Sequence, residues 1–202
     1  MTRFSARLAD VRPSATIAVK QEADRLKEAG VDIIDFGPGE PDFNTPENIK
    51  RAAHRAIEEN LSHYLPTQGL PALRRAIASR YRRLYDADYS EAEVIVTCGG
   101  KSGLFETALA LFDRGDEVII PAPYWVSFPE QVLLAGGRPV ILPTREDDGF
   151  VARAAAAARL VTKATRGIVL CSPSNPTGAI IPEEEIAAFA DLAIERDLYL
   201  IF

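Results

Sequence analysis

Short apolar runs alternate with longer amphipathic segments from residue 94 to the end of the sequence. The apolar runs are continuous, which is typical of strands buried on both faces of a parallel sheet. They predict strands at 94–98, 117–120, 140–142, 168–171 and 198–202. The amphipathic segments predict helices at 101–112, 125–135, 152–162 and 182–196, the last with Pro182 as its first residue. Strands separated by helices need crossover connections, so we expect a three-layer α/β/α fold around a mostly parallel sheet.

The first 90 residues follow a different pattern, with helices predominating. We predict helices at 14–28, 45–59 and 71–84, and a short strand at 31–36. Gly30 is placed to end the first helix, and Thr45 is placed to cap the second. The apolar face of the third helix is predicted to comprise Leu73, Ile77, Tyr81 and Leu84. Residues 1–45 are predicted to form an arm or lobe outside the main sheet.

Composition excludes several functions. The 202 residues carry a net charge of −6 with scattered basic residues, which argues against a nucleic-acid surface. The sequence has no apolar stretch of about 20 residues, so no membrane span is expected. Two cysteines, Cys98 and Cys171, do not make a disulfide framework, and no metal site is predicted. We therefore expect a cytoplasmic protein.

The clearest candidate for chemistry is the loop Ser172-Pro173-Ser174-Asn175-Pro176-Thr177-Gly178, which follows a predicted strand. Ligands of open α/β sheets bind at the carboxyl ends of strands. The two prolines restrict the backbone on either side of Asn175. The amide side chain of Asn175 both donates and accepts hydrogen bonds. This pattern predicts a rigid loop that presents an amide to a ligand.

A glycine pair, Gly99-Gly100, joins the predicted strand at 94–98 to the following helix. Glycines allow close backbone approach, and amides at a helix N-terminus favour an anion such as phosphate. A plain strand-to-helix turn would look the same. The segment lacks the G-x-G-x-x-G spacing of a nicotinamide site. Lys101 is either an exposed lysine of the first turn or an anion ligand.

The asparagine loop resembles that of the class I aminotransferases, fold-type I enzymes that use pyridoxal phosphate. Four further segments are similar to the same family, in the same order, and bacterial aspartate aminotransferases give the closest match. These segments are 36–43, Ser62-His63-Tyr64, 98–103 and Pro123-Tyr124-Trp125. The family's small domain would include residues 1–45, and its partial pyridoxal-phosphate-binding domain would comprise residues 46–202.

The resemblance also implies which residues bind the cofactor and the substrate. Gly99, Gly100 and Lys101 would hold the phosphate, Trp125 would stack on the pyridine ring, and Asn175 would bind the phenolic oxygen. Tyr64 would reach the phosphate of a neighbouring subunit, which implies a homodimer. The implied substrate-binding residues are Gly39, Trp125, Asn175, Thr16 and Lys101, with Arg12 a further cation near Thr16 in the sequence.

The expected reaction is transfer of the amino group of aspartate, or of a related dicarboxylic amino acid, to a 2-oxo acid such as 2-oxoglutarate. Prephenate is an alternative acceptor. The Schiff-base lysine and the aspartate at the pyridine nitrogen would lie beyond Phe202, so the resemblance implies an inactive fragment without a catalytic residue. Another fold-type I activity (a C–S lyase, decarboxylase or synthase), a non-catalytic domain that binds a phosphate ligand, and a nicotinamide oxidoreductase are the alternatives.

Overall fold

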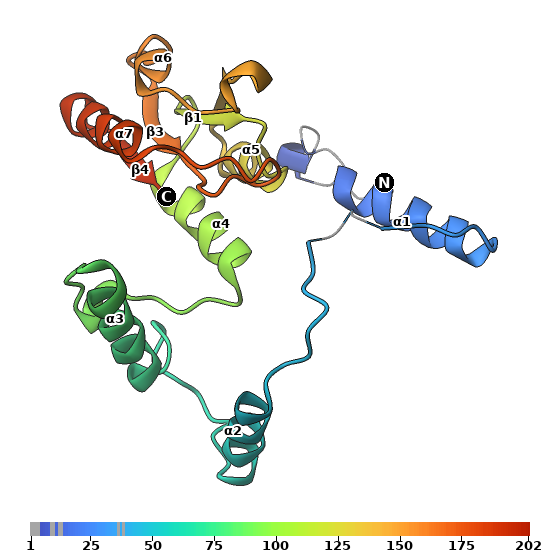
Figure 1. Cartoon of the computed structure of the whole chain (residues 1–202). Helices are drawn as coiled ribbons and strands as arrows, with labels where there is room; N and C mark the ends of the chain where they lie inside the picture. Colours follow the sequence, from blue (N-terminus) through green and yellow to red (C-terminus); the bar gives the residue numbers. More distant parts are fainter. Residues whose placement is uncertain (1–4, 9–10, 12–13, 36, 38) are drawn as a thin grey trace. The chain divides into compact units, whose positions relative to one another are not determined.

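The computed structural model describes residues 5–8, 11, 14–35, 37 and 39–202 (Figure 1). The chain forms two compact units. The first comprises Met1–Ile33 and Leu104–Phe202, and the second comprises Ile34–Gly103. The boundary after Gly103 falls inside helix α4 (Gly100–Leu111). The predicted division at residue 45 stays a prediction.

A four-stranded parallel sheet forms the centre of the first unit. Its strands are β1 (Glu117–Ala122), β2 (Arg138–Pro143), β3 (Thr165–Val169) and β4 (Tyr199–Ile201). The strand order is β2-β1-β3-β4, and every neighbouring pair is parallel. Val118, Ile119 and Ile168 are fully buried. The continuous apolar runs therefore mark strands covered on both faces in the central pair, β1 and β3, whereas the edge strands β2 and β4 are partly exposed.

Helices cover the two faces of this sheet in separate layers (Figure 1). The C-terminal part of α4 and helix α5 (Ser127–Ala135) pack with Val118, Ile120 and Val169. Helices α6 (Ala154–Ala158) and α7 (Glu183–Arg196) pack with Ile119 and Ile168. Successive residues of a strand point to opposite faces, so both layers draw on the same strands. The predicted three-layer α/β/α fold around a parallel sheet is confirmed.

The connections leave β1 and β3 towards opposite faces. Helix α5, which follows β1, contributes Phe128 and Val132 to one layer. Helix α7, which follows β3, contributes Phe189 and Leu192 to the other. Adjacent parallel strands whose connections diverge in this way make a topological switch point, with a crevice beyond their carboxyl ends. The fold itself thus predicts a ligand site beyond the carboxyl ends of β1 and β3.

The remaining elements are helical. The first unit also holds η1 (Ala6–Leu8), α1 (Ala15–Glu28) and η3 (Glu146–Asp148). The second unit holds α2 (Glu47–Glu58), α3 (Pro71–Tyr85) and η2 (Glu91–Glu93). Gly30, with φ of 81°, follows α1 as predicted. Arg75 of α3 pairs with Glu91 of η2 at 3.1 Å, which joins these two elements.

Several local predictions are wrong. Residues 31–35 and 94–98 are not in strands, and Phe36 lies outside the described residues. The Val96 amide is bonded to the carbonyl of Gln68 at 3.0 Å rather than to a strand. Pro46, rather than Thr45, occupies the N-cap position of α2. Pro182, which was predicted to be the first residue of α7, is its N-cap instead. The predicted apolar face of α3 is also displaced, because the structure buries Arg74 and Ala78.

Gly167 in β3 leaves no room for a side chain. A Cβ atom there would lie 2.9 Å from the ring of Phe112 and 3.3 Å from the carbonyl oxygen of Tyr199. We expect Gly167→Ala to lower the free energy of unfolding by about 1–3 kcal/mol, because overpacking forces the core to shift. Urea unfolding measures this change. In the double variant, Phe112→Leu should recover part of the unfolding free energy that Gly167→Ala loses. If the losses of the two single substitutions simply add, the Phe112 ring does not limit the space at Gly167.

Candidate functional site

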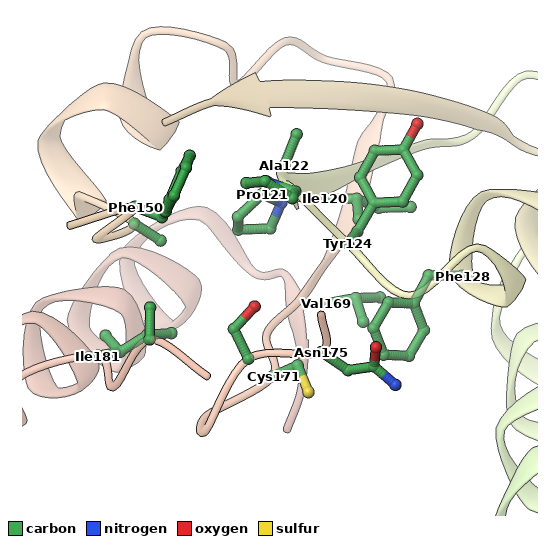
Figure 2. Close-up of a pocket in the computed structure, with 14 residues that line it drawn as sticks. Ile120, Pro121, Ala122, Tyr124, Phe128, Phe150, Val169, Cys171, Asn175 and Ile181 are labelled. Atoms are coloured by element: carbon green, nitrogen blue, oxygen red, sulfur yellow. The ribbon is translucent and has the colours of Figure 1, made fainter. Parts of the chain in front are cut away.

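Two loops from adjacent strands line one small pocket at the switch point (Figure 2). The turn after β1 contributes Tyr124, and the loop after β3 contributes Cys171 and Asn175. Phe150 and Ile181 close another side. The cavity volume is about 20 Å³, close to what one water molecule requires. A pyridine ring therefore does not fit inside the pocket, and larger ligands meet these residues only from outside it.

Hydrogen bonds within the loop after β3 fix its shape. The Ser174 amide donates to Ala179 O at 2.8 Å, and the Gly178 amide donates to Ser174 O at 2.7 Å. The Ser172 hydroxyl accepts from the Ile181 amide at 3.0 Å and closes the base of the loop. Backbone groups and hydroxyls thus determine the loop conformation. Asn175 is exposed, and its amide makes no hydrogen bond within the described part of the chain, so it is available to a ligand.

The turn after β1 is fixed from β2 and from α5. The Thr144 hydroxyl, which follows β2, donates to Ala122 O. The Trp125 ring packs edge-on against Phe128, with ring centroids 5.4 Å apart and planes at 88°. Tyr124 lines the pocket, whereas Trp125 packs beside it through Phe128. The structure therefore places the predicted aromatic segment at the switch point, and the stacking role of Trp125 stays a prediction.

A third segment closes the pocket with Phe150. Gly149 and Phe150 both have left-handed backbone, with φ of 62° and 56°. Arg153 bonds to Asp148 at 2.8 Å and to Glu185 of α7 at 3.3 Å. Glu185 also accepts from the Ala154 amide at 2.8 Å. These contacts attach the Phe150 segment to α7.

Sequence reasoning assigned Asn175 to a site but did not assign the other residues that line the pocket. For Phe150 and Ile181, no motif marks their positions, because they reach the pocket only through tertiary packing. Tyr124 lies inside the quoted Pro123-Tyr124-Trp125 segment, and Cys171 directly precedes the asparagine loop. Their position at the carboxyl ends of predicted strands was the available signal. Tyr124, Phe150, Cys171 and Ile181 are among the lining residues that were not assigned.

The second unit holds the predicted anion-binding turn. Gly99 has φ of 89°, a conformation that favours glycine, and α4 begins at Gly100. The Thr97 hydroxyl donates to Gly99 O at 3.0 Å, and the Gly99 amide donates to Thr97 O at 2.7 Å. A Cβ atom at Gly99 or Gly100 would meet nothing within 4 Å, so the backbone there is open to a ligand. This helix start fits a phosphate group.

The other predicted residues are accessible. Gly39 lies in an irregular exposed segment, Tyr64 is fully exposed, and Lys101 is the second residue of α4. These three belong to the second unit, together with Gly99 and Gly100. Thr16 is exposed in the first turn of α1, in the first unit, while Arg12 lies outside the described residues. The structure therefore gathers Asn175 and Tyr124 in one unit and the glycine turn with Tyr64 in the other.

No described helix is long and apolar enough to cross a membrane. No group of three or more His, Cys, Asp or Glu side chains in the described residues is arranged to hold a metal ion.

The Ser172 hydroxyl is expected to stabilise the asparagine loop. Ser172→Ala leaves the Ile181 amide without its acceptor, so we expect the free energy of unfolding to fall by about 1 kcal/mol. Hydrogen exchange at Ile181 should become faster, whereas Ser172→Thr should restore the slow exchange. Ser90→Ala, in the exposed cap of η2, is the control for the substitution itself. Unchanged exchange at Ile181 in Ser172→Ala would show that the hydroxyl does not hold the loop.

The ion pair between Asp148 and Arg153, which flank Phe150, should depend on pH. Hydrogen bonding to Arg153 is the main cause that lowers the pKa of Asp148 from its ordinary value. The stability that the Asp148–Arg153 ion pair adds to the folded state is therefore present above the unfolded pKa of aspartate, about 3.9. It is lost as pH falls through the lower pKa that Asp148 has in the folded state. In an NMR titration, Arg153→Ala should raise the pKa of Asp148 towards that of a free aspartate, and Arg159→Ala should not. An unchanged Asp148 pKa in Arg153→Ala would rule out the contact.

Known proteins are similar to this chain in sequence and in fold. The aspartate/prephenate aminotransferase of Thermus thermophilus is 45% identical over 201 residues, which are 100% of this chain and 52% of that protein. The aspartate aminotransferase of Bacillus subtilis is 41% identical, over 98% of this chain and 51% of that protein. The chain thus spans about half the length of the curated relatives that it matches.

Solved structures agree. An aspartate aminotransferase from Thermus thermophilus with maleate matches 99% of this chain and 52% of its own, with a TM-score of 0.95 and 45% identity. The family model described as aminotransferase class I and II matches residues 31–202, which include the glycine turn, the turn after β1 and the asparagine loop. The chain therefore belongs to the class I and II aminotransferases.

Proposed function

We propose that the protein represented by this chain is a pyridoxal-phosphate-dependent aminotransferase. It would transfer the amino group of aspartate, or of a related dicarboxylic amino acid, to a 2-oxo acid such as 2-oxoglutarate. The position of Asn175 supports this proposal most strongly. Its exposed amide follows β3, beside the turn after β1, at the point where connections diverge to opposite faces of the sheet.

The chain offers suitable contacts for the phosphate, the phenolic oxygen and the ring of pyridoxal phosphate. The open glycine turn at the start of α4 suits the phosphate, and Lys101 would add a positive charge. The Asn175 amide would donate to the phenolic oxygen, which favours the ionised form of that oxygen. Trp125 would present an aromatic face to the pyridine ring and exclude water. Bound pyridoxal phosphate would supply the electron sink that the reaction requires.

Dicarboxylate specificity has separate support. The Thermus thermophilus structure was determined with maleate, a four-carbon dicarboxylate, and the curated relatives are named for aspartate or for aspartate and prephenate. In this chain, the Gly39 amide would bind the α-carboxylate. Lys101 and the Thr16 hydroxyl would bind the distal carboxylate. Tyr64, which is fully exposed, would serve a second subunit in a homodimer.

The positions of the lysines in the described residues support a role for this chain in binding rather than in the chemical step. Lys20 and Lys27 lie in α1, Lys50 in α2, Lys101 in α4 and Lys163 before β3. None of them lines the pocket at the switch point. We therefore assign the binding of cofactor and substrate to these 202 residues and expect no transamination from them alone.

A chimera tests the proposal. Residues 1–202 are joined to the remaining half of the Thermus thermophilus enzyme, and transfer from aspartate to 2-oxoglutarate or to prephenate is assayed. We expect turnover from the chimera and none from the 202-residue chain. Asn175→Ala in the chimera should lower kcat/KM by about 10- to 100-fold, because a hydrogen bond to a charged group is lost. Ser90→Ala is the matched control.

Two outcomes contradict the proposal. One is a folded chimera that shows the absorbance of bound pyridoxal phosphate but does not transaminate any dicarboxylic amino acid. The other is full activity of the Asn175→Ala chimera. Turnover by the 202-residue chain, free of host enzymes, would contradict only the expectation that these residues do not transaminate alone.

A further inference from the structure

Arg74 is an arginine buried without a carboxylate. It lies in α3 and is only 7% exposed. Its Nη1 donates to Gln68 Oε1 at 2.6 Å, while its Nε is buried without a hydrogen-bond partner. No acidic side chain of the described residues pairs with it, although the adjacent Arg75 pairs with Glu91 at the surface. Burying a guanidinium is costly, so an arginine at this position requires a structural reason.

The partner of Arg74 connects two segments that lie far apart in the sequence. The side chain of Gln68 accepts from Arg74, while its backbone carbonyl accepts from the Val96 amide at 3.0 Å. The next residue, Gly69, has φ of 96°. A Cβ atom on Gly69 would lie 2.7 Å from the Cβ atom of Val96, so the two backbones approach closely. The segment 66–69 is therefore packed directly on Val96.

The same chain of contacts continues into the glycine turn. Thr97 follows Val96, and its hydroxyl donates to Gly99 O at 3.0 Å. That hydroxyl lies 2.9 Å from where a Cβ atom of Gly103 would be, so Thr97 also fits tightly against the first turn of α4. The Gly103 amide donates to Gly99 O at 3.2 Å. An unbroken series of contacts thus runs from Arg74 to the start of α4.

We propose that Gln68 and Arg74 are positioning residues for the Gly99-Gly100 turn. Arg74 fixes the side chain of Gln68, the carbonyl of Gln68 fixes Val96, and Thr97 then holds the turn in its open conformation. Identifying the ligand of this turn as the cofactor phosphate rests on the proposed function. The mechanical connection between Arg74 and the turn does not depend on that identification.

A glutamine suits this position for a chemical reason. Its side-chain oxygen satisfies Arg74 while its backbone carbonyl is already used by Val96. Methionine has nearly the same length and volume but no comparable acceptor, so Gln68→Met removes one interaction with little change in packing. Glutamate restores an acceptor, so Gln68→Glu is the conservative rescue.

Hydrogen exchange of the unliganded 202-residue chain, followed by NMR, tests the proposal. In Gln68→Met, we expect exchange at the Val96, Gly99 and Gly103 amides to become about tenfold faster, because a buried charged donor loses its partner. In Gln68→Glu, these rates should stay within about twofold of those in the original chain. Arg75→Ala removes an exposed ion pair from the same helix and is the matched control; it should leave the three rates unchanged.

The opposite pattern overturns the proposal. If Gln68→Met leaves exchange at Gly99 and Gly103 unchanged, Gln68 does not position the turn. Should Gln68→Met fail to fold, exchange in the original chain at low urea gives the answer. The Gly69, Val96, Gly99 and Gly103 amides must then share one opening reaction, and independent openings would refute the connection. Because no ligand is present, failure of the aminotransferase proposal would not alter either result.

Discussion

The packing of helices on both faces of β1 and β3 creates the candidate site. Val118 and Ile120 face one helical layer, and Ile119 and Ile168 face the other. Because both faces must be covered, the connection after β1 goes to one layer and the connection after β3 goes to the other. A crevice beyond the carboxyl ends of these strands is the geometric consequence. Asn175 and Tyr124 reach the pocket there through the fold itself.

The loops at this point are shaped by groups other than those assigned to the ligand. Hydroxyls of Ser172 and Thr144 bond to the backbone, and they leave the amide of Asn175 exposed. The second unit repeats the arrangement. There, Thr97 holds the glycine turn, and the backbone at Gly99 and Gly100 stays open. In both units, supporting contacts order the backbone in advance, which reduces the entropy lost when a ligand binds.

Sequence patterns were reliable where burial is continuous. The patterns predict β1 to β4 and the periodic helices α4 and α7 within a few residues. In β1 and β3, burial on both faces requires a continuous apolar run, and the edge strands β2 and β4 keep such a run although they are partly exposed. The run at 94–98 had the same character, yet its Val96 amide bonds to Gln68. Only tertiary context distinguishes these cases. The buried face of α3 was misjudged for the same reason, since no periodicity indicates that Arg74 is buried.

The candidate site was predictable to the extent that motifs carry it. Asn175 and the glycine pair stand in segments whose turn chemistry is evident from proline and glycine. Phe150 and Ile181 enter the pocket through packing between α7 and the segment after η3, which no local pattern encodes. The sequence alone therefore does not predict contacts between residues that are tens of positions apart in the chain.

Crystals of the protein grown with pyridoxal phosphate would show whether these two turns bind the cofactor. We expect the Asn175 side-chain nitrogen about 3 Å from the phenolic oxygen of the cofactor, and the phosphate at the Gly99-Gly100 turn. Cofactor density at another place, with Asn175 facing only solvent, would contradict this placement.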